Sequence, residues 1–525
     1  MAPATPAFAE SDPASLAAYV RARAADADGK VDRAATGYAE ALAKTPDDPV
    51  IAVRAYRAAL AAGDAPLANR ARVVLERAGV APADSAVLAL AEAAVAKPAP
   101  SAEVDKALAR LGAGPLSFLV PPLRAWSVGQ TDPKRALGLL ELTGKNPIGL
   151  HYATETRALL MIGDGRIDDG VALLRVLLGV DRGGLELRMA AARLLVGQGR
   201  GDLAASLLAG DEPLIRRQRA TLGKGAKPDF GFGVSYILTR LAADLGDDET
   251  APLSIVLTRS ALRVDPGNDR ARLLLAAALT SEEALPSALA VLDEIKPASP
   301  YAPAARVERV ELLEKAGRDD DALKESAAIA RSSDAGVADL QRYGDRLVAA
   351  ARFDEAAAVY RQAIDQAGPA VDWVLYLQLG GALDQAGKWD EALPLLEKAV
   401  ALAPDQPIAL NYLGYGQLDH GGDVATARRL LEKASSLKPD NLSILDSLAW
   451  AYFKAGDDAK ALPLLERAAA GEPANETISE HLGDAYWRTG RRYEARYAWR
   501  AAAITAEGAD AARLATKIAD GLARN

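Results

Sequence analysis

The sequence predicts an all-α protein, a right-handed α-solenoid of stacked helix-turn-helix units. Two observations carry this prediction. Small residues and prolines recur at a step of 34 or 35 residues, and the chain is rich in alanine but only 5% Phe, Trp and Tyr. Alanine is the strongest helix former and lets helices pack closely. A chain of 525 residues is also too long for one ordinary core, so an array of repeats or several domains is expected.

The clearest units lie in the C-terminal third, where four segments align with one another. The small residues form three series: Gly380, Gly414, Ala449 and Gly483; Ala392, Ala427, Ala461 and Ala495; and Ala399, Ala434, Ala468 and Ala502. A small residue near the middle of a first helix lets the second helix cross it closely. The gap between units is expected to be filled by large residues of the second helices, namely Leu396, Leu431, Leu465 and Trp499.

Prolines and glycines mark the ends of these helices. A proline lacks the amide N–H and clashes with the preceding turn, so it ends a helix. The prolines that close the units are Pro404, Pro439 and Pro473. Glycines mark the turns between the two helices of a unit. These are Gly387, Gly421, Gly422, Gly456 and Gly490.

This arrangement of a small residue, two alanines and a proline on a unit of 34 residues resembles the tetratricopeptide repeat. The period continues more weakly toward the N-terminus, where Ala288, Ala322 and Ala356 keep the step. It breaks between Ala204 and Ser254, which are 50 residues apart. The break contains "RRQRATLGKGAKPDFGFG", which we expect to form an irregular, basic, glycine-rich insertion before a helix.

The period and its breaks divide the chain into six parts. They are a disordered tail or signal-peptide remnant at 1–14, degenerate repeats at 15–210, an irregular insertion and helix at 211–250, central repeats at 251–370, well-formed repeats at 371–505, and a capping helix at 506–525.

The N-terminal tail has two interpretations. Ala7, Phe8 and Ala9 precede Glu10 in a small-x-small pattern like the end of a secretory signal, although the charged and apolar parts of a signal are absent. The alternative is a disordered tail rich in alanine and proline. No apolar run of the sequence is long enough for a transmembrane span.

No catalytic, metal or cofactor site is expected. The three histidines, His151, His420 and His481, are scattered without metal-ligand spacing, and the chain has no cysteine. No metalloprotease, nucleophile-elbow or P-loop motif occurs. The net charge of −9 does not suit sequence-independent binding of nucleic acid. The sequence therefore predicts a protein that is not an enzyme.

Protein partners are expected on the concave face, which the first helices of tetratricopeptide units line. Aromatic rings flanked by charges suit extended peptides, because rings supply rigid contact area and charges fix orientation. Counting from the prolines assigns twelve residues to this face: Asn411, Tyr412, Tyr415, Asp419, Asp446, Trp450, Lys454, Glu480, His481, Asp484, Trp487 and Arg488. Only Asn411 and Lys454 match the clamp that some family members use for a C-terminal carboxylate, so a receptor for chaperone tails is disfavoured.

A narrower resemblance rests on "DQPIALNYLGYGQLDHGG", "DSLAWAYFK" and "EHLGDAYWRTGRRYEARYAWRAA", with "GFGVSYILTRLA" and "SPYAPAARVERVELLEKAGR" further back. Over roughly residues 225–505 the chain resembles proteobacterial envelope tetratricopeptide proteins. Some of these are outer-membrane lipoproteins that hold a C-terminal processing protease and present cell-wall hydrolases to it. The resemblance implies a periplasmic or outer-membrane-associated adaptor, with a periplasmic protease and its substrates as partners. No cysteine is present to carry a lipid anchor.

A second function stays open at this stage. The same repeats suit an assembly factor of a secretion or polysaccharide-export machine, in the cytoplasm or the envelope. That alternative predicts partner subunits in place of a protease and its substrates. A signal peptide encoded upstream of residue 10 would favour the envelope adaptor.

Overall fold

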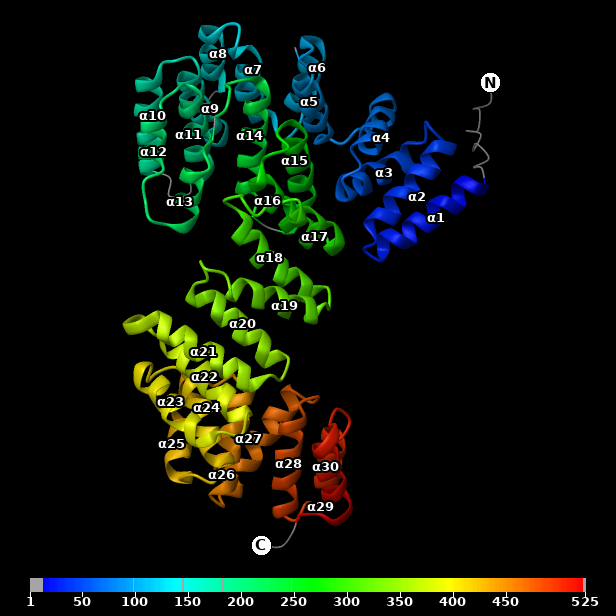
Figure 1. Ribbon diagram of the computed structural model, residues 1–525. Coiled ribbons are helices and arrows are strands. Elements are labelled where there is room, and N and C mark those ends of the chain that lie inside the picture. The colour runs from blue at the N-terminus through cyan, green and yellow to red at the C-terminus, as the bar shows by residue number, and fades with distance from the viewer. Residues whose placement is uncertain are drawn as a thin grey trace. The chain divides into compact units, whose positions relative to one another are not determined.

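The computed structural model describes residues 13–97, 99–143, 146–180, 184–223, 225–246 and 248–522. Within these residues the chain forms 30 α-helices and no β-strand (Figure 1). The predicted all-α fold of paired helices is confirmed. Apart from residues 13 and 14, the predicted N-terminal tail lies outside the described residues. None of the helices in these ranges is long and apolar enough to cross a membrane.

The chain divides into two compact units, Met1–Ala322 and Leu323–Asn525. The helices of the first unit are α1 Pro13–Ala27, α2 Val31–Lys44, α3 Pro49–Ala62, α4 Ala65–Arg77, α5 Ser85–Val95, α6 Ser101–Gly112, α7 Val120–Gly129, α8 Pro133–Leu139, α9 Pro147–Gly163, α10 Ile167–Val180, α11 Leu185–Gly197, α12 Gly201–Leu207, α13 Pro213–Ala220, α14 Phe230–Asp244, α15 Ala251–Val264, α16 Asp269–Ser281, α17 Leu285–Asp293 and α18 Ala302–Lys315.

Helix α19, Asp319–Ala330, contains the boundary between the units. The helices of the second unit are α20 Val337–Ala349, α21 Phe353–Ala367, α22 Trp373–Gln385, α23 Trp389–Leu402, α24 Pro407–Asp419, α25 Val424–Leu437, α26 Leu442–Lys454, α27 Asp458–Gly471, α28 Glu476–Arg488, α29 Arg492–Ala502 and α30 Gly508–Asp520.

The turns between paired helices of the second unit depend on glycine. Gly387, Gly421, Gly456 and Gly490 have φ values of 74°, 72°, 79° and 84°. This left-handed conformation costs little for glycine and is strained for other residues. The prediction that these glycines form the turns is therefore confirmed for all four.

Four pairs of helices in the second unit cross at a glycine, which is Gly344, Gly380, Gly414 or Gly483. A Cβ atom added to Gly380 would lie 2.6 Å from Leu396, and one added to Gly414 would lie 2.8 Å from Leu431. Both leucines are fully buried. We call each such small residue and the large side chain that covers it a crossing pair.

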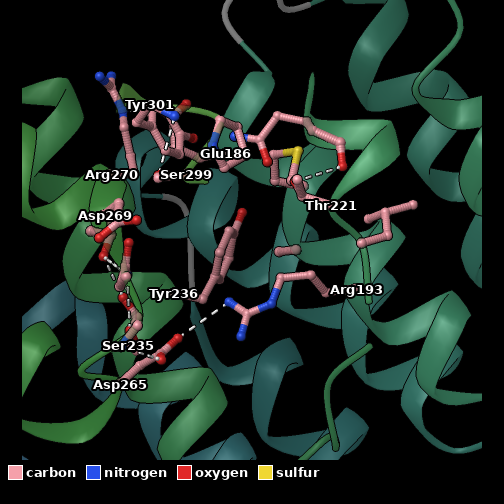
Figure 2. A pocket seen from close by; sticks show the side chains of 18 of the residues that line it. Glu186, Arg193, Thr221, Ser235, Tyr236, Asp265, Asp269, Arg270, Ser299 and Tyr301 are labelled. Atoms are coloured by element: carbon pink, nitrogen blue, oxygen red, sulfur yellow. Dashed lines mark hydrogen bonds and ion pairs between the residues drawn. The ribbon is translucent and has the colours of Figure 1, made fainter. Parts of the chain in front are cut away.

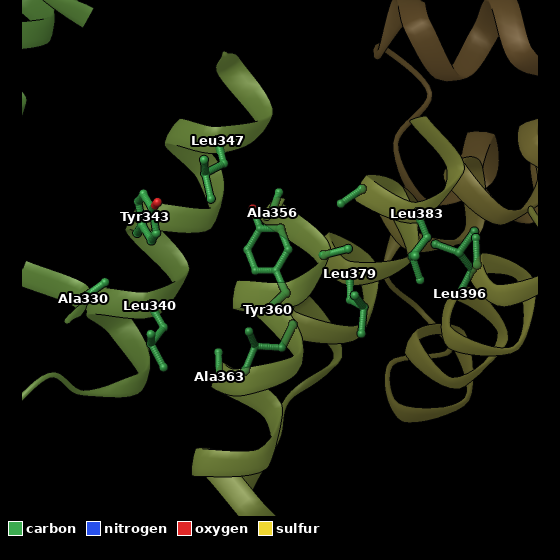
Figure 3. Close-up of a cluster of buried hydrophobic side chains, with 14 of the residues drawn as sticks. Ala330, Leu340, Tyr343, Leu347, Ala356, Tyr360, Ala363, Leu379, Leu383 and Leu396 are labelled. Carbon is green, nitrogen blue, oxygen red and sulfur yellow. The ribbon is translucent and has the colours of Figure 1, made fainter. Parts of the chain in front are cut away.

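The large side chains of the crossing pairs lie in three separate apolar clusters. The cluster around helices α20 to α23 contains Leu340, Tyr360, Leu379, Leu383 and Leu396 (Figure 3). Tyr360 covers Gly344, and its hydroxyl donates to Asp345 at 2.6 Å. The single polar atom of this large ring is thus satisfied while the ring itself is only 1% exposed.

The last crossing pair of the second unit is Gly483 and Trp499. A Cβ atom at Gly483 would overlap the indole ring, so the glycine leaves the space that the ring fills. Trp499 is fully buried, and its Nε1–H donates to Asp484 at 2.8 Å. On its other side the ring packs with Leu514 of α30. Trp499 therefore joins the last repeat to the C-terminal helix, as predicted.

In the first unit, helices that are far apart in the sequence pack against each other. Helix α15 packs against α14 and α16, which neighbour it in sequence, and also against α3 and α5. Arg259 of α15 donates to the carbonyl oxygens of Leu60 and Ala61 at 2.9 Å, at the C-terminus of α3. Burial lowers the pKa of Arg259 to about 10. The side chain stays charged at neutral pH, which suits the negative end of a helix dipole.

Replacing Trp499 with alanine should destabilise the C-terminal repeats. The loss of a fully buried ring is expected to lower the free energy of unfolding of this region by ~3–5 kcal/mol. Because repeat arrays couple mainly to nearest neighbours, amide exchange should rise first in α28 to α30. Tyr493→Ala is the control, because Tyr493 is 72% exposed on the same helix. Equal exchange in the two variants would contradict the assignment.

Candidate functional site

The residues predicted to bind partners lie on three successive first helices of the second unit. Asn411, Tyr412, Tyr415 and Asp419 lie on α24; Asp446, Trp450 and Lys454 on α26; and Glu480, His481, Asp484, Trp487 and Arg488 on α28. The structure brings side chains of these helices together. It also buries five of the twelve, which repeat counting had not predicted.

Helices α26 and α28 meet through an aromatic and ionic cluster. The rings of Trp450 and His481 stack with centroids 3.9 Å apart. The Nδ1–H of His481 donates to Asp446 at 3.0 Å. Phe453 stacks on the same indole, with centroids 4.7 Å apart. Trp450, His481 and Asp446 are each at most 9% exposed. They serve the contact between neighbouring repeats and leave little surface for a partner.

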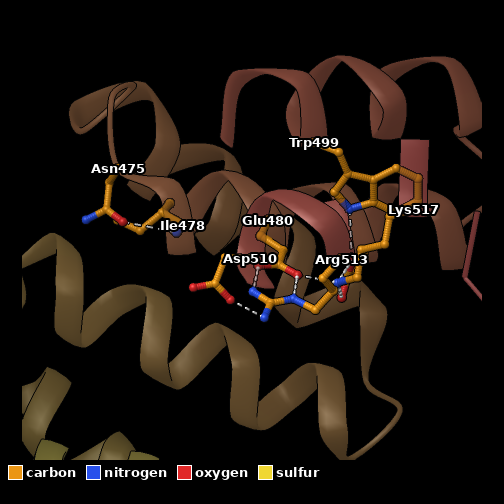
Figure 4. A network of polar contacts seen from close by, with 8 residues as sticks. Asn475, Ile478, Glu480, Trp499, Asp510, Arg513 and Lys517 are labelled. Carbon is orange, nitrogen blue, oxygen red and sulfur yellow. Dashed lines mark hydrogen bonds and ion pairs between the residues drawn. The ribbon is translucent and has the colours of Figure 1, made fainter. Parts of the chain in front are cut away.

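The acidic residues of α28 bind a segment of this chain. Lys517 of α30 places its Nζ 2.6 Å from Glu480 and 2.7 Å from Asp484 (Figure 4). Arg513 donates to both carboxylate oxygens of Glu480, at 2.9 and 2.7 Å. Burial of Glu480 opposes its ionisation, but the hydrogen bonds from Arg513 and Lys517 outweigh burial and lower its pKa to about 2.

Trp487 and Arg488 at the end of α28 are also engaged within the chain. The indole of Trp487 packs with Trp499 and Ile518, and a Cβ atom at Gly521 would overlap it. The guanidinium of Arg488 lies 3.4 Å from the centroid of the Phe453 ring. It also donates to the Phe453 carbonyl at 2.6 Å. The last repeat is thus covered by α30, which lies within the capping helix predicted at 506–525, although the contacts of its side chains could not be read from the repeat pattern.

The open part of the predicted surface lies on α24 and at the end of α26. Asp419 and Lys454 are exposed, and Asn411, Tyr412 and Tyr415 are half-buried. The Oδ1 atom of Asn411 has no hydrogen-bond partner among the described residues. Burial raises the pKa of Tyr412 to about 12, so its hydroxyl stays protonated. A binding role for all twelve residues remains a prediction.

A second candidate site, which the sequence did not predict, is a cavity of about 350 Å³ in the first unit (Figure 2). Its walls come from α11, α14 and the start of α16, together with residues 299–301 and with Gln218, Thr221, Leu222 and Gly225. The only signal in the sequence was the insertion that breaks the repeat period. The insertion forms one wall of the cavity.

Glycine allows this insertion to lie directly against α11. The amide of Ala226 donates to the carbonyl oxygen of Arg193 at 2.8 Å. A Cβ atom at Gly197 would overlap the Ala226 carbonyl, and one at Gly225 would overlap the backbone of Gly197. The glycine-rich sequence thus permits a close backbone contact that holds the wall in place.

Paired charges line the cavity. Arg193 forms an ion pair with Asp265 at 3.2 Å, and Arg270 forms one with Glu186 at 2.8 Å. Both pairs join α11, which carries Glu186 and Arg193, to residues 265–270 (Figure 2). Each arginine has five N–H groups, and each of these ion pairs is made through a single nitrogen. The cavity therefore has spare hydrogen-bond donors.

A buried amide adds to these donors. Gln218 of α13 is only 4% exposed, and its Nε2 has no hydrogen-bond partner among the described residues. The Gln218 amide faces the hydroxyl of Tyr301 and lowers the pKa of that hydroxyl, but burial outweighs this effect and raises the pKa of Tyr301 to about 12. An unpaired buried N–H group is costly, so an oxygen of a ligand at this position would be stabilising.

Behind the cavity, a buried polar network fixes Tyr236 of α14. The hydroxyl of Tyr236 donates to Glu155 of α9 at 2.5 Å. Glu155 also pairs with His151 at 3.0 Å and with Arg240 at 3.4 Å. The hydrogen bond to Glu155 raises the pKa of His151. In the ranges that the structure describes, no group of three His, Cys, Asp or Glu side chains could hold a metal ion.

Two segments match family models of the tetratricopeptide repeat. One match covers residues 257–303 and the other residues 373–418. Tetratricopeptide repeats are therefore present in both units. No curated protein matches the chain.

The chain also has structural neighbours of low similarity. MamA from Desulfovibrio magneticus RS-1, residues 41 to the end, is 19% identical, with coverage of 33% of this chain and 96% of that chain and a TM-score of 0.29. Cut9 in the APC/C Cut9–Hcn1 assembly is 16% identical, with 96% of each chain covered and a TM-score of 0.39. YrrB, described as a tetratricopeptide protein with an unusual peptide-binding site, is 18% identical. The match covers 33% of this chain and 88% of that chain, with a TM-score of 0.28.

The ion pairs of Glu480 should make the C-terminal repeats sensitive to acid. The folded-state pKa of about 2 lies below the ordinary value of 4.5. The pairs therefore stabilise the fold above the ordinary value, and this contribution is lost as the pH falls toward 2. Glu480→Gln should flatten the pH dependence of amide exchange in α30 over this range. Glu397→Gln, at an exposed position of α23, should retain the wild-type profile, and a flattened profile there would count against this assignment.

Proposed function

We propose that this protein is a non-catalytic scaffold that holds segments of protein partners against the first helices of its repeats. Tetratricopeptide repeats generally serve as scaffolds for protein interaction. The observation that carries the proposal is the cavity between α11, α14 and α16, which has hydrogen-bonding walls. The arginines and carboxylates of the cavity form ion pairs with each other. This arrangement suits the binding of a segment better than it suits catalysis.

An extended peptide fits this cavity better than a purely apolar ligand. A peptide main chain offers carbonyl oxygens at regular intervals, and side chains on alternate sides. Gln218 and the free N–H groups of Arg193 can donate to such oxygens, and the Tyr301 ring supplies apolar contact area. The two ion pairs between α11 and residues 265–270 would orient a segment that carries charges of its own.

We further propose that the scaffold works in the bacterial envelope and presents substrates to a protease. This proposal rests on the resemblance of residues 225–505 to envelope tetratricopeptide proteins and on the small-x-small pattern at Ala7 to Ala9. The alternative is an assembly factor of a secretion or polysaccharide-export machine. Affinity purification from periplasmic and cytoplasmic fractions of the native host would separate the two. Recovery of a protease with its substrates supports the first proposal, and recovery of export subunits without a protease contradicts it.

The cavity can be tested with an array of short peptides from envelope proteins. Gln218→Leu and Arg193→Ala should each weaken peptide binding by about 1–3 kcal/mol, because each removes a buried or charged donor. Arg216→Ala is the matched control, since Arg216 is exposed on the same helix as Gln218. Circular dichroism should show unchanged helix content in all three variants. Loss of binding in the control, or no binding by the wild type, would overturn the proposal.

A further inference from the structure

Helix α29 exposes a line of large side chains to solvent. Tyr493 is 72% exposed, Tyr497 54% and Ile504, just beyond the helix, 83%. With exposed Arg500 they are spaced at intervals of four, three and four residues. This spacing places Tyr493, Tyr497 and Arg500 along one side of α29, and Ile504 follows in the turn just beyond the helix. We call these four residues the α29 stripe.

The earlier repeats show that the fold does not need these side chains. The residues at the same repeat positions, aligned through Ala392, Ala427 and Ala461, are Asp390, Pro394, Glu397 and Ala401 in α23; Ala425, Arg429, Glu432 and Ser436 in α25; and Ala459, Pro463, Glu466 and Ala470 in α27. None of them is aromatic or a large aliphatic residue. At the position of Arg500 all three carry glutamate, so the last repeat reverses the charge.

The stripe is also separate from the packing face of α29. Ala495, Trp499 and Ala502 of the same helix are buried in the fold. The stripe lies away from them and packs mainly on itself. The rings of Tyr493 and Tyr497 meet with centroids 4.9 Å apart, and their hydroxyl groups are 3.1 Å apart.

No carboxylate of the described residues neutralises the charge of the stripe. The Arg500 guanidinium lies 5.8 Å from the centroid of the Tyr497 ring. Among the described residues it has no carboxylate partner. Nearby Arg492 is exposed and stands over the Trp487 ring at 5.0 Å, likewise without a carboxylate in the described part of the chain. A chain with a net charge of −9 thus presents a local basic and aromatic surface.

We propose that the α29 stripe is a docking site for an acidic segment of a protein partner. Tyrosine and arginine are enriched at the energetically important positions of protein interfaces, where rigid rings are buried at low entropic cost. Unpaired Arg500 selects carboxylates, and Tyr493, Tyr497 and Ile504 select apolar side chains beside them. The inference rests on the proposed scaffold function and adds a second surface with its own partner chemistry.

The same features disfavour two other occupants. A helix that lies in a membrane surface buries a broad apolar face in lipid, whereas the apolar face of α29 is turned into the fold and only a narrow stripe is free. A symmetric contact between two copies would use the same patch twice and so place two arginines, with no added carboxylate, in one interface.

The test uses a fluorescein-labelled peptide of alternating glutamate and leucine, and a matched peptide of lysine and leucine. Wild-type protein should bind the acidic peptide at least tenfold more tightly than the basic one, and salt should weaken this binding. Arg500→Glu, which restores the residue type of the other repeats, and the double variant Tyr493→Ala/Tyr497→Ala should each lose at least tenfold in affinity. Leu402→Ala and Leu437→Ala, at exposed positions of earlier second helices, should bind as wild type does.

Three results would overturn the proposal. The first is equal binding of both peptides, and the second is unchanged binding by both stripe variants. The third is a pair of stripe variants that bind the acidic peptide as wild type does but change either sedimentation with phosphatidylglycerol vesicles, which would indicate a membrane surface, or the sedimentation coefficient of the protein, which would indicate a second copy. Gln218→Leu distinguishes binding at the stripe from binding at the cavity. This variant should keep the wild-type affinity for the acidic peptide, and the stripe variants should keep the wild-type affinity for array peptides that bind the cavity.

Discussion

The close crossing of two helices at a small residue is the contact on which the second unit depends. In Gly344 and Tyr360, Gly380 and Leu396, and Gly483 and Trp499, the large residue follows the small one by sixteen positions. Any side chain on these glycines would overlap the ring or branched chain that covers them. The crossing therefore fixes how the second helix lies on the first. It also decides which residues of each helix are left to face a neighbour or solvent.

This dependence explains why the sequence predicted so much of the fold and so little of the sites. A crossing pair lies within one repeat and recurs at a constant step, so Gly380, Gly414 and Gly483 could be identified from spacing alone. The turn glycines are equally local. By contrast, Lys517 reaches Glu480 from a helix outside the period, and Gln218 lies in an insertion that has no counterpart in other repeats. Such contacts join a repeat to a segment outside the repeat period. Counting positions within the repeats therefore cannot predict them.

The aromatic residues between 480 and 499 show how one short segment serves several purposes. Trp499 fills the crossing at Gly483, and Trp487 lies beneath α30. Tyr493 and Tyr497 face solvent, at positions where the other repeats have small, polar or proline residues. Packing accounts for the tryptophans but not for the two tyrosines. Side chains that the fold does not require are the strongest indication of a partner surface.

The central claim is that the crossing pairs form a rigid frame and that partners bind preformed surfaces away from them. Residue-resolved hydrogen exchange of the full chain, with and without a saturating peptide taken from the array, tests this claim most directly. The account predicts slower exchange around residues 218–236 and 265–270 when peptide is bound, with amides near Leu396 and Leu431 slow and unchanged in both states. Faster or slower exchange at those crossing pairs on binding would contradict it, because the partner would then remodel the stack of helices.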